Sequence, residues 1–195
     1  MISLIVKVDN NNLIGDSQRN CMPWEGIELD EKLIQANHAD MKHFITLRKW
    51  SNPETAPDIV IMGRKTRESI PIKFRPFHQN INYIISRNTN LDLWNTKWEL
   101  VEIFTSVESC LAHISKHHPD RDIHIIGGGQ IYQYVLEHDL VDRIEMTVLD
   151  HEFQWDVYFP ELGSKRKEIN RAQVNPNDNN KHAFVTYEKN PSTIS

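Results

Sequence analysis

The sequence predicts a single α/β domain in which most strands are parallel and one end of the sheet is antiparallel. Short apolar runs rich in β-branched residues alternate along the chain with segments of helical periodicity, which is the pattern of an α/β sheet. The chain has 195 residues, of which 39% are hydrophobic and 25% charged, as in one ordinary globular domain. Because no repeat or linker divides it, we expect one domain over 1–189 and a polar tail over 190–195.

Each expected element follows from its hydrophobic pattern and from the breakers that flank it. Strands are assigned to apolar runs, and the four consecutive apolar residues 59–62 fit a strand buried on both faces. Helices are assigned where apolar residues recur at helical spacing, and they end near proline, glycine or asparagine. In chain order we expect a strand at 2–8, a short hydrophobic return at 13–15, a helix at 30–50, a strand at 58–62, a helix at 64–69, a strand at 81–85, a helix at 107–117, a strand at 123–126, a helix at 130–137, and strands at 144–149 and 183–187.

Charge and cysteine content exclude several classes of protein. The net charge of −5 is the wrong sign for affinity based on nucleic-acid phosphates, so no nucleic-acid partner is expected. No apolar run approaches the length of a membrane span, and the first eight residues lack the features of a signal peptide. Two cysteines, Cys21 and Cys110, are too few for a disulfide scaffold. We therefore expect a cytoplasmic protein with reduced thiols and no membrane partner.

Three consecutive glycines, Gly127, Gly128 and Gly129, stand between a predicted buried strand and the start of a predicted helix. Without side chains, their N–H groups can approach an anion such as a pyrophosphate closely. The spacing differs from the G-x-G-x-x-G motif of dinucleotide-binding folds. A tight strand-to-helix turn without a ligand is the alternative interpretation.

A second candidate anion site follows another predicted strand. Arg64, Lys65 and Thr66 open a short helix, where cations oppose the helix dipole. A bound phosphate would remove this conflict, and Ser86 and Arg87, at the end of a further strand, would add a second contact. The alternative is a solvated basic rim without a ligand.

Asp40 lies next to an apolar stripe of the predicted helix that includes Met41 and Phe44. A carboxylate beside apolar side chains is costly unless it is paired, so Asp40 is a candidate ligand-binding group. The alternative places it on the polar edge of the helix, facing water. His113 and His117 have the i, i+4 spacing of metal ligands, but their segment resembles an exposed helix end, and no metal site is expected.

Six segments of the chain follow one another in a diagnostic order. They are Met22-Pro23-Trp24, Val60 to Pro71, Arg75-Pro76-Phe77, Asn82 to Arg87, Ile126 to Gly129 and Asp156 to Pro160. In this order they resemble the dihydrofolate reductase family, over residues 1–189. The resemblance implies a central eight-stranded mixed sheet, mostly parallel and flanked by helices. It also implies NADPH-dependent reduction of 7,8-dihydrofolate to 5,6,7,8-tetrahydrofolate by a cytoplasmic monomer that supplies one-carbon and thymidylate metabolism.

For the substrate, the resemblance implies that Asp40 binds the 2-amino and N3 side of the pterin in a charge-assisted pair. It assigns Thr147 to a hydrogen bond with that carboxylate and Trp24 to an ordered water. Hydride would pass from nicotinamide C4 to pterin C6, with N5 protonated from solvent. Antifolates such as methotrexate or trimethoprim are the implied inhibitors. The residues implied to bind the substrate are Ile5, Val6, Met41, Phe44, Ile70, Arg75, Ile126 and Tyr132.

For NADPH, the resemblance assigns Arg64 and Arg87 to the adenosine 2′-phosphate, and it implies a cis peptide bond between Gly127 and Gly128. The full set of implied cofactor-binding residues is Lys7, Ile14, Gly63, Arg64, Lys65, Thr66, Ser86, Arg87, Gly127, Gly128, Gly129, Gln130 and Ile131.

The chain departs from the family pattern at three places. Asn80 stands where an arginine usually clamps the glutamate α-carboxylate of folate, and a neutral amide cannot replace it. Either Arg75 or Arg48 substitutes for that arginine, or the glutamate tail is held loosely. Lys7 stands where a small residue is common, and its side chain is expected to point away along the strand. Residues 25–37 exceed the family's compact version, which would extend the helix or reshape the pocket mouth.

Two other functions stay open at this point. One is a related NADPH-dependent reductase of another pterin or of a pyrimidine, and the other is a non-catalytic relative that binds NADPH or RNA. The joint presence of Trp24, Asp40 and Thr147 argues against the first. The retained site residues and the negative charge argue against the second.

Overall fold

The computed structural model describes residues 1–18, 22, 28–49, 57–89, 101–174 and 182–193. All of the predicted helices and strands are present, with ends shifted by a few residues at most. The elements are β1 (Ile2–Val8), β2 (Leu13–Gly15), α1 (Glu31–Leu47), β3 (Ile59–Gly63), α2 (Arg64–Ser69), β4 (Ile81–Ile85), β5 (Val101–Phe104), α3 (Val107–His117), β6 (Ile123–Ile125), α4 (Gly129–Glu137), β7 (Arg143–Val148), β8 (Val157–Tyr158), β9 (Arg166–Gln173) and β10 (Ala183–Lys189), with 3-10 turns at Ile72–Phe74 and Pro191–Thr193.

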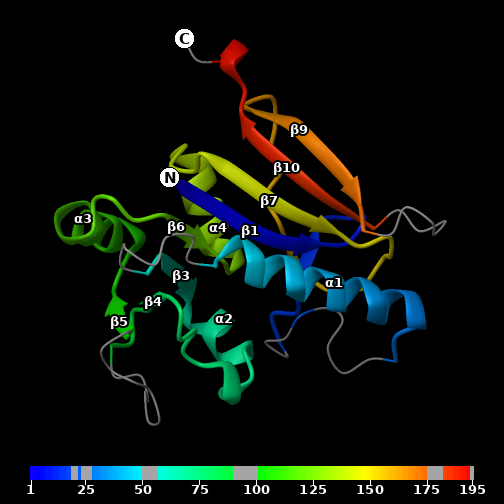
Figure 1. Ribbon diagram of the computed structural model, residues 1–195, viewed down its shortest axis with the longest axis horizontal. Helices are drawn as coiled ribbons and strands as arrows, with labels where there is room; N and C mark the ends of the chain where they lie inside the picture. The colour runs from blue at the N-terminus through cyan, green and yellow to red at the C-terminus, as the bar shows by residue number, and fades with distance from the viewer. Residues whose placement is uncertain (19–21, 23–27, 50–56, 90–100, 175–181, 194–195) are drawn as a thin grey trace.

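One eight-stranded sheet forms the centre of the molecule, in the order β5-β4-β3-β6-β1-β7-β10-β9 (Figure 1). The six strands from β5 to β7 are parallel, and β10 and β9 continue the sheet antiparallel to β7 and to each other. The two remaining short strands, β2 and β8, pair separately. This is the mixed, mostly parallel sheet that was expected, with its antiparallel end at the carboxyl-terminal side.

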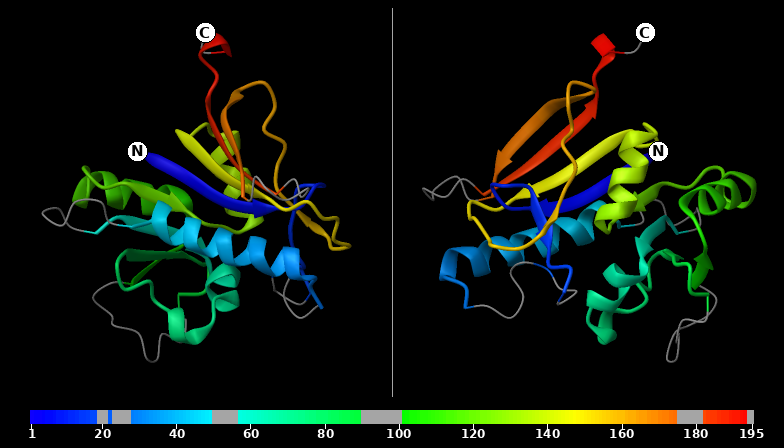
Figure 2. Two further views of the ribbon diagram at one scale, coloured as in Figure 1. Left: turned by 45° about the vertical axis from the view of Figure 1, so that its right-hand side comes forward. Right: turned by 180° about the vertical axis from the view of Figure 1, so that it is seen from behind.

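Helices cover both faces of the sheet, with α1 on one face and α4 on the other (Figures 1 and 2). Along β1, side chains point alternately to the two faces of the sheet. Leu4, Val6 and Val8 belong to the main core, together with residues of α3 and α4. The opposite face carries a smaller core of β3 and β4 residues, which includes Met62 and Ile84. The space between α1 and this second core is where the candidate site lies.

The apolar stripe of α1 is only partly covered: Phe44 packs against the second core, but its neighbours in the stripe do not. Met41 is 53% exposed and Ile45 is 45% exposed, whereas the buried residues of the helix are Leu33 and Ala36. Leu33 and Ala36 belong to the first two turns, and they pack with a separate cluster that includes Phe153. Of the long segment before Asp40, residues 31–37 belong to α1 and residues 25–27 lie outside the described part of the chain. Met41 and Ile45 are left facing a cleft.

Two strands of the main sheet, β5 and β9, were not predicted. Seven of the eight residues of β9 are exposed, and its sequence is rich in charge, so no hydrophobic alternation marks it. It forms a sheet edge, where charged side chains hinder pairing with other chains. At the other edge, β5 has only four residues, of which Val101 alone is buried. Among the described residues, no helix has the length and apolar character needed to cross a membrane.

Candidate active site

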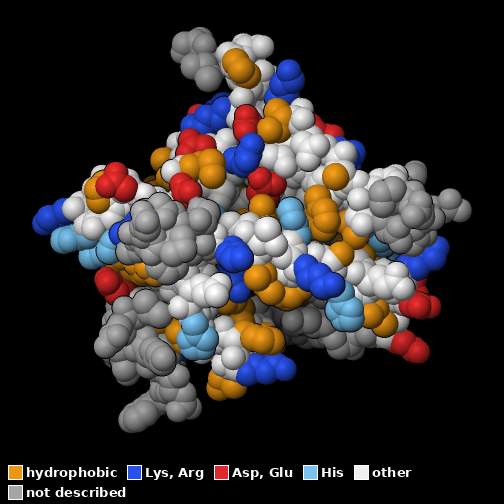
Figure 3. Space-filling view, viewed as in Figure 1, with side chains coloured by type: hydrophobic (Ala, Val, Ile, Leu, Met, Phe, Trp, Pro, Cys, Tyr) orange, Lys and Arg blue, Asp and Glu red, His pale blue; other side chains and the backbone are white. Residues whose placement is uncertain are grey.

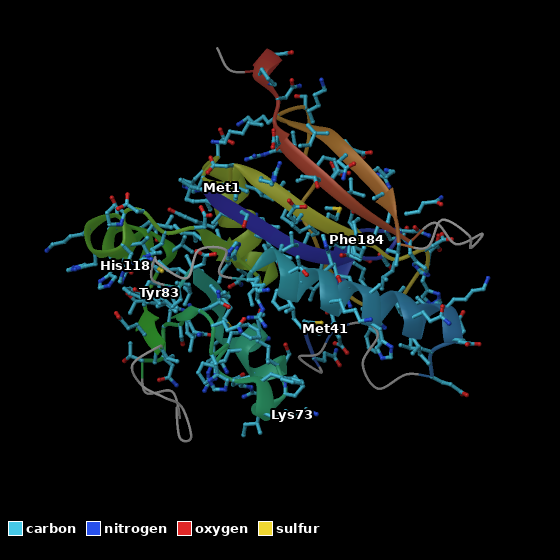
Figure 4. All side chains as sticks on the ribbon, viewed as in Figure 1. Met1, Met41, Lys73, Tyr83, His118 and Phe184 are labelled. Carbon is cyan, nitrogen blue, oxygen red and sulfur yellow. The ribbon has the colours of Figure 1, made fainter. Side chains whose placement is uncertain are left out.

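A large cleft runs along the carboxyl ends of the parallel strands. Its volume is about 1540 Å³, larger than the roughly 300–1,000 Å³ of a single small-molecule pocket. The ends of β1, β3, β4, β5 and β6 all contribute, and α1 supplies the opposite wall. Met41 on α1 and Lys73 beyond α2 lie on its two sides (Figure 4). Figure 3 shows hydrophobic and basic side chains interspersed over α1 and beneath it, so the site can receive ligands that are partly apolar and partly anionic.

Asp40 lies inside the cleft and is paired with Lys7. The Lys7 Nζ atom lies 2.8 Å from Asp40 Oδ2, and these side chains are only 10% and 14% exposed. Lys7 Nζ also donates a hydrogen bond to Asn37 Oδ1 at 3.0 Å. The sequence predicts that the Lys7 side chain points away along the strand, and this prediction is wrong. The side chain instead reaches across to α1. This contact is the largest difference between the expected site and the observed one.

Strand register explains why Lys7 faces α1. Lys7 is the Cα partner of Thr147 on β7, and Thr147 is in turn the partner of Phe184 on β10. Paired residues point to the same face of a sheet, and the Phe184 ring packs on His43 of α1, with ring centroids 4.1 Å apart. Thr147 is thus buried on the α1 face beside Lys7. The carboxylate of Asp40 is bonded to Lys7 here, not to the Thr147 hydroxyl.

The glycine turn brings the ends of β3 and β6 together. The Gly63 N–H donates to the Gly127 carbonyl at 2.7 Å, and the peptide bond between Gly127 and Gly128 is cis, as the resemblance implied. Gly127 has φ +126°, and a Cβ there would lie 3.1 Å from Thr66 Oγ1. The turn therefore has no room for a side chain at Gly127. Helix α4 starts directly after the turn, at Gly129. Backbone N–H groups at such a helix start favour an anion.

Tyr132, in the first turn of α4, joins this turn to the central strand. Its hydroxyl donates to the Ile5 carbonyl at 2.7 Å, in a fully buried position. Burial raises the pKa of the Tyr132 phenol above its ordinary value, so the hydroxyl remains a donor. Ile5, Ile126 and Tyr132 together form the apolar floor of the cleft.

Basic side chains line the part of the cleft near α2. Arg64 Nη1 donates to both carboxylate oxygens of Glu68 at 2.9 Å, one helical turn along α2. Lys65 Nζ donates to the Ser17 carbonyl at 3.4 Å. Arg87 is exposed at the end of β4, on the same rim. Arg64, Lys65 and Arg87 supply positive charge where α2 begins, which suits a phosphate-bearing ligand.

Ser17 is held in turn by Asp156. The Ser17 hydroxyl and backbone N–H both donate to the Asp156 carboxylate. These hydrogen bonds lower the pKa of Asp156 below its ordinary value. The contact ties the segment after β2 to the residue before β8, at the edge of the cleft.

Arg48, near the end of α1, is held in the cleft wall by Asn80. Arg48 Nη1 donates to Asn80 Oδ1 at 2.8 Å, and its Cζ atom lies 4.1 Å from the centroid of the Phe77 ring. The Nε atom is buried without a hydrogen-bond partner, so the guanidinium retains donor capacity. Arg75, the other arginine considered, instead donates to the backbone carbonyls of Glu68 and Ile70. Of these two arginines, Arg48 lines the cleft and Arg75 does not.

Most residues expected in the site line this one cleft. Arg75 and Thr147 do not contribute to its wall, and Trp24 lies outside the described residues, although Met22 of the same motif lines the cleft. The expected residues that line it are Ile5, Val6, Lys7, Ile14, Asp40, Met41, Phe44, Gly63, Arg64, Lys65, Thr66, Ile70, Ser86, Arg87, Ile126, Gly127, Gly128, Gly129, Gln130, Ile131 and Tyr132.

Asn37 and Asn80 hold charged side chains of the cleft, and the sequence did not assign this role to either of them. Asn37 lies three residues before Asp40, so its place on the same helix face was available from helical spacing. Asn80 contacts Arg48, which lies 32 positions away in the sequence, and the sequence alone shows only that Asn80 is not an arginine. Local patterns carry no signal for such a pair.

Fold and cleft together define the class: an α/β protein with a large cleft beyond the carboxyl ends of its parallel strands, which is where α/β folds of this kind bind ligands. A family model described as dihydrofolate reductase matches residues 1–189. The chain belongs to the dihydrofolate reductase family, and it is an oxidoreductase of that family.

Individual relatives agree with this assignment. Dihydrofolate reductase from Pneumocystis carinii is 30% identical over 165 residues, which cover 82% of this chain and 73% of that protein. Dihydrofolate reductase from Aedes albopictus is 25% identical over 189 residues, or 95% of this chain and 93% of that protein. The bifunctional dihydrofolate reductase-thymidylate synthase 1 of Arabidopsis thaliana is 33% identical over 140 residues, which cover 70% of this chain but 27% of that longer protein.

Proposed function

We propose that this protein reduces 7,8-dihydrofolate to 5,6,7,8-tetrahydrofolate with NADPH. The observation that carries the proposal is the position of Asp40: a largely buried carboxylate in a cleft whose other side is a glycine turn with basic neighbours. A carboxylate in such a place binds a heterocycle that presents two N–H donors side by side, as the 2-amino and N3 groups of a pterin do. The family membership supports the same substrate.

The residues around the glycine turn fit NADPH. The closed turn at Gly127 and Gly128, next to the Thr66 hydroxyl, offers backbone donors for a pyrophosphate. Arg64 and Arg87 would hold the 2′-phosphate that distinguishes NADPH from NADH. When bound, NADPH supplies the hydride that reaches pterin C6.

Arg48 and the apolar wall would hold the rest of the substrate. Phe44 packs edge-on against Phe77, with ring centroids 5.7 Å apart, so both rings are fixed where an aromatic ring of the substrate would lie. Arg48, stacked on Phe77 and fixed by Asn80, would bind the glutamate carboxylate. In this arrangement, Arg48 of α1 binds the carboxylate that the neutral Asn80 side chain cannot bind.

The residues of the protein hold the reacting groups in position more than they take part in the reaction. The buried Tyr132 hydroxyl fixes the carbonyl of Ile5, and the floor of apolar side chains excludes water from one side of the pterin. No acidic side chain is assigned to N5, so the proton comes from solvent. Holding the reacting atoms close and aligned would supply much of the rate acceleration.

The Lys7–Asp40 pair favours a second candidate, a reductase of the same fold that acts on another pterin or on a pyrimidine. Because the ammonium already binds Oδ2, a bidentate contact must share that oxygen with Lys7. The second candidate would apply if dihydrofolate could not bind Asp40 beside Lys7.

The test is to add dihydrofolate to the protein with NADPH and to follow the loss of NADPH absorbance, with and without methotrexate. The proposal predicts rapid oxidation that methotrexate blocks. Oxidation only with other pterins or pyrimidines would select the second candidate. Binding of NADPH without turnover of any of them would mean that the protein is not a reductase.

A further inference from the structure

Lys7 holds the carboxylate to which the proposed function assigns the pterin. Its Nζ atom lies 2.8 Å from Asp40 Oδ2 and 3.0 Å from Asn37 Oδ1, and both charged side chains line the cleft. With 10% and 14% of these side chains exposed, solvent screens the pair poorly. Any ligand group that binds Asp40 must therefore share it with an ammonium that is already in place.

The backbone gives Lys7 no other face to occupy. Its neighbours in β1, Val6 and Val8, point into the core on the α3 and α4 side of the sheet. Lys7 lies on the α1 side, in register with the buried Thr147. The Lys7 ammonium can move within the cleft, but it can leave the cleft only if the conformation of β1 changes.

We propose that Lys7 is a specificity-determining residue, an internal cation that makes the site prefer neutral heterocycles over cationic ones at Asp40. The inference rests on the proposed function, because that function places the heterocycle on this carboxylate. A neutral dihydropterin donates hydrogen bonds to the free edge of Asp40 and adds no net charge. A basic 2,4-diaminopyrimidine binds a carboxylate as a cation, which would place a second positive charge beside the Lys7 ammonium. Lys7 therefore weakens the binding of diaminopyrimidines more than that of dihydrofolate.

The test compares trimethoprim, a 2,4-diaminopyrimidine, with dihydrofolate in equilibrium binding to the protein loaded with NADP⁺, which has no hydride to transfer. Lys7→Met removes the charge and keeps the length of the side chain. Lys42→Met is the matched control, because Lys42 is an exposed lysine of the same helix as Asp40 and does not line the cleft. We expect Lys7→Met to lower the Kd of trimethoprim by about tenfold or more and that of dihydrofolate by less than about threefold. Lys42→Met should change neither by more than about twofold.

A double variant shows whether the effect passes through Asp40. In an Asp40→Asn background, Lys7→Met should no longer tighten trimethoprim binding, because without the carboxylate the ligand is not held there as a cation. An unchanged or higher trimethoprim Kd in Lys7→Met would overturn the inference. So would an equal gain for both ligands, which would mean that Lys7 blocks space and does not select by charge.

Failure of the proposed function has a different signature. If the wild-type protein oxidises no NADPH with dihydrofolate, but Lys7→Met still tightens trimethoprim through Asp40, the function is wrong and the inference stands. Circular dichroism of each variant verifies that the fold is retained before the Kd values are compared.

Discussion

Asn80 and Arg48 bind each other through two reciprocal hydrogen bonds. Arg48 Nη1 donates to Asn80 Oδ1 at 2.8 Å, and Asn80 Nδ2 donates to the Arg48 carbonyl at 3.1 Å. Asn80 is fully buried, and it also donates to the Asp58 carbonyl at 3.4 Å, so it is itself fixed to the sheet. Asn80, at the position where the resemblance implies an arginine, therefore orients an arginine of α1.

Replacing Arg48 should affect substrate binding and leave turnover nearly intact. In Arg48→Met, the KM for dihydrofolate should rise by about tenfold or more, because a buried charge-assisted contact is lost, while kcat stays within about threefold. Asn80→Ala should act in the same direction, with a smaller effect. A dihydropterin without the glutamate tail is the control. If its KM rose as much as that of dihydrofolate, Arg48 would not be the carboxylate clamp.

Glu68 should weaken the selection of NADPH over NADH. Its carboxylate binds Arg64 through two contacts of 2.9 Å, and it would repel a 2′-phosphate on the same guanidinium. Both side chains are partly exposed, so releasing Arg64 in Glu68→Gln should raise the kcat/KM ratio of NADPH to NADH by only about two- to fivefold. Arg64→Gln should lower the ratio. A lower ratio in Glu68→Gln would show that the ion pair helps to present Arg64.

Gly127 should tolerate no side chain. In Gly127→Ala, the Cβ would lie 3.1 Å from Thr66 Oγ1 at a φ of +126°, so stability should fall by about 1–3 kcal/mol and NADPH should bind more weakly. Gly163→Ala is a matched control, because Gly163 also has a positive φ, +59°, but has open space around it. That variant should lose stability without a change in the Kd of NADPH, measured by fluorescence titration. Equal Kd values of NADPH for both variants would contradict the assignment of the glycine turn to NADPH.

His124 should make the fold sensitive to acid. It is buried, with its ring nitrogens 2.8 Å from Ser3 Oγ and 3.4 Å from Asp58 Oδ2, and burial lowers its pKa below the ordinary 6.5 although Asp58 opposes this. A folded-state pKa below the unfolded value means that the unfolded chain binds more protons. The stabilisation is therefore complete above the unfolded pKa and is lost as the pH falls through 6.5.

Urea denaturation between about pH 7 and pH 5 measures this effect. The free energy of unfolding should decrease with acidification in the wild-type protein, and less steeply in His124→Gln. His43 and His118, whose pKa values are also lowered by burial, contribute to the slope of both proteins. Identical slopes would show that His124 does not titrate in this range.

Hydrophobic patterns were sufficient for the centre of the fold but not for its edges. The apolar runs of β1, β3 and β4 are buried on both faces, so their sequences alone distinguish them from loops. In contrast, β9 pairs with β10 through its backbone while its side chains remain in solvent. A strand of this kind has no hydrophobic signal, because its partner determines its conformation.

The candidate site shows the same division between local and long-range information. The glycine turn and the cations of α2 are each contiguous in sequence, so local patterns predict both as candidate anion sites, and both line the cleft. The contact between Lys7 and Asp40 joins β1 to α1 across 33 residues, and the direction of the Lys7 side chain depends on the register of β1 with β7. Register is a property of the assembled sheet, so the sequence alone led to the wrong direction.

The most direct test of the central claim is the turnover of dihydrofolate with NADPH by Asp40→Asn. Asn keeps the size of the side chain but removes the charge that would hold the pterin, so kcat should fall by about 10²- to 10⁴-fold. Unchanged NADPH binding would verify that the cofactor half of the cleft is intact. A rate within about threefold of the wild-type value at neutral pH would contradict the assignment of Asp40, and with it this account of the site.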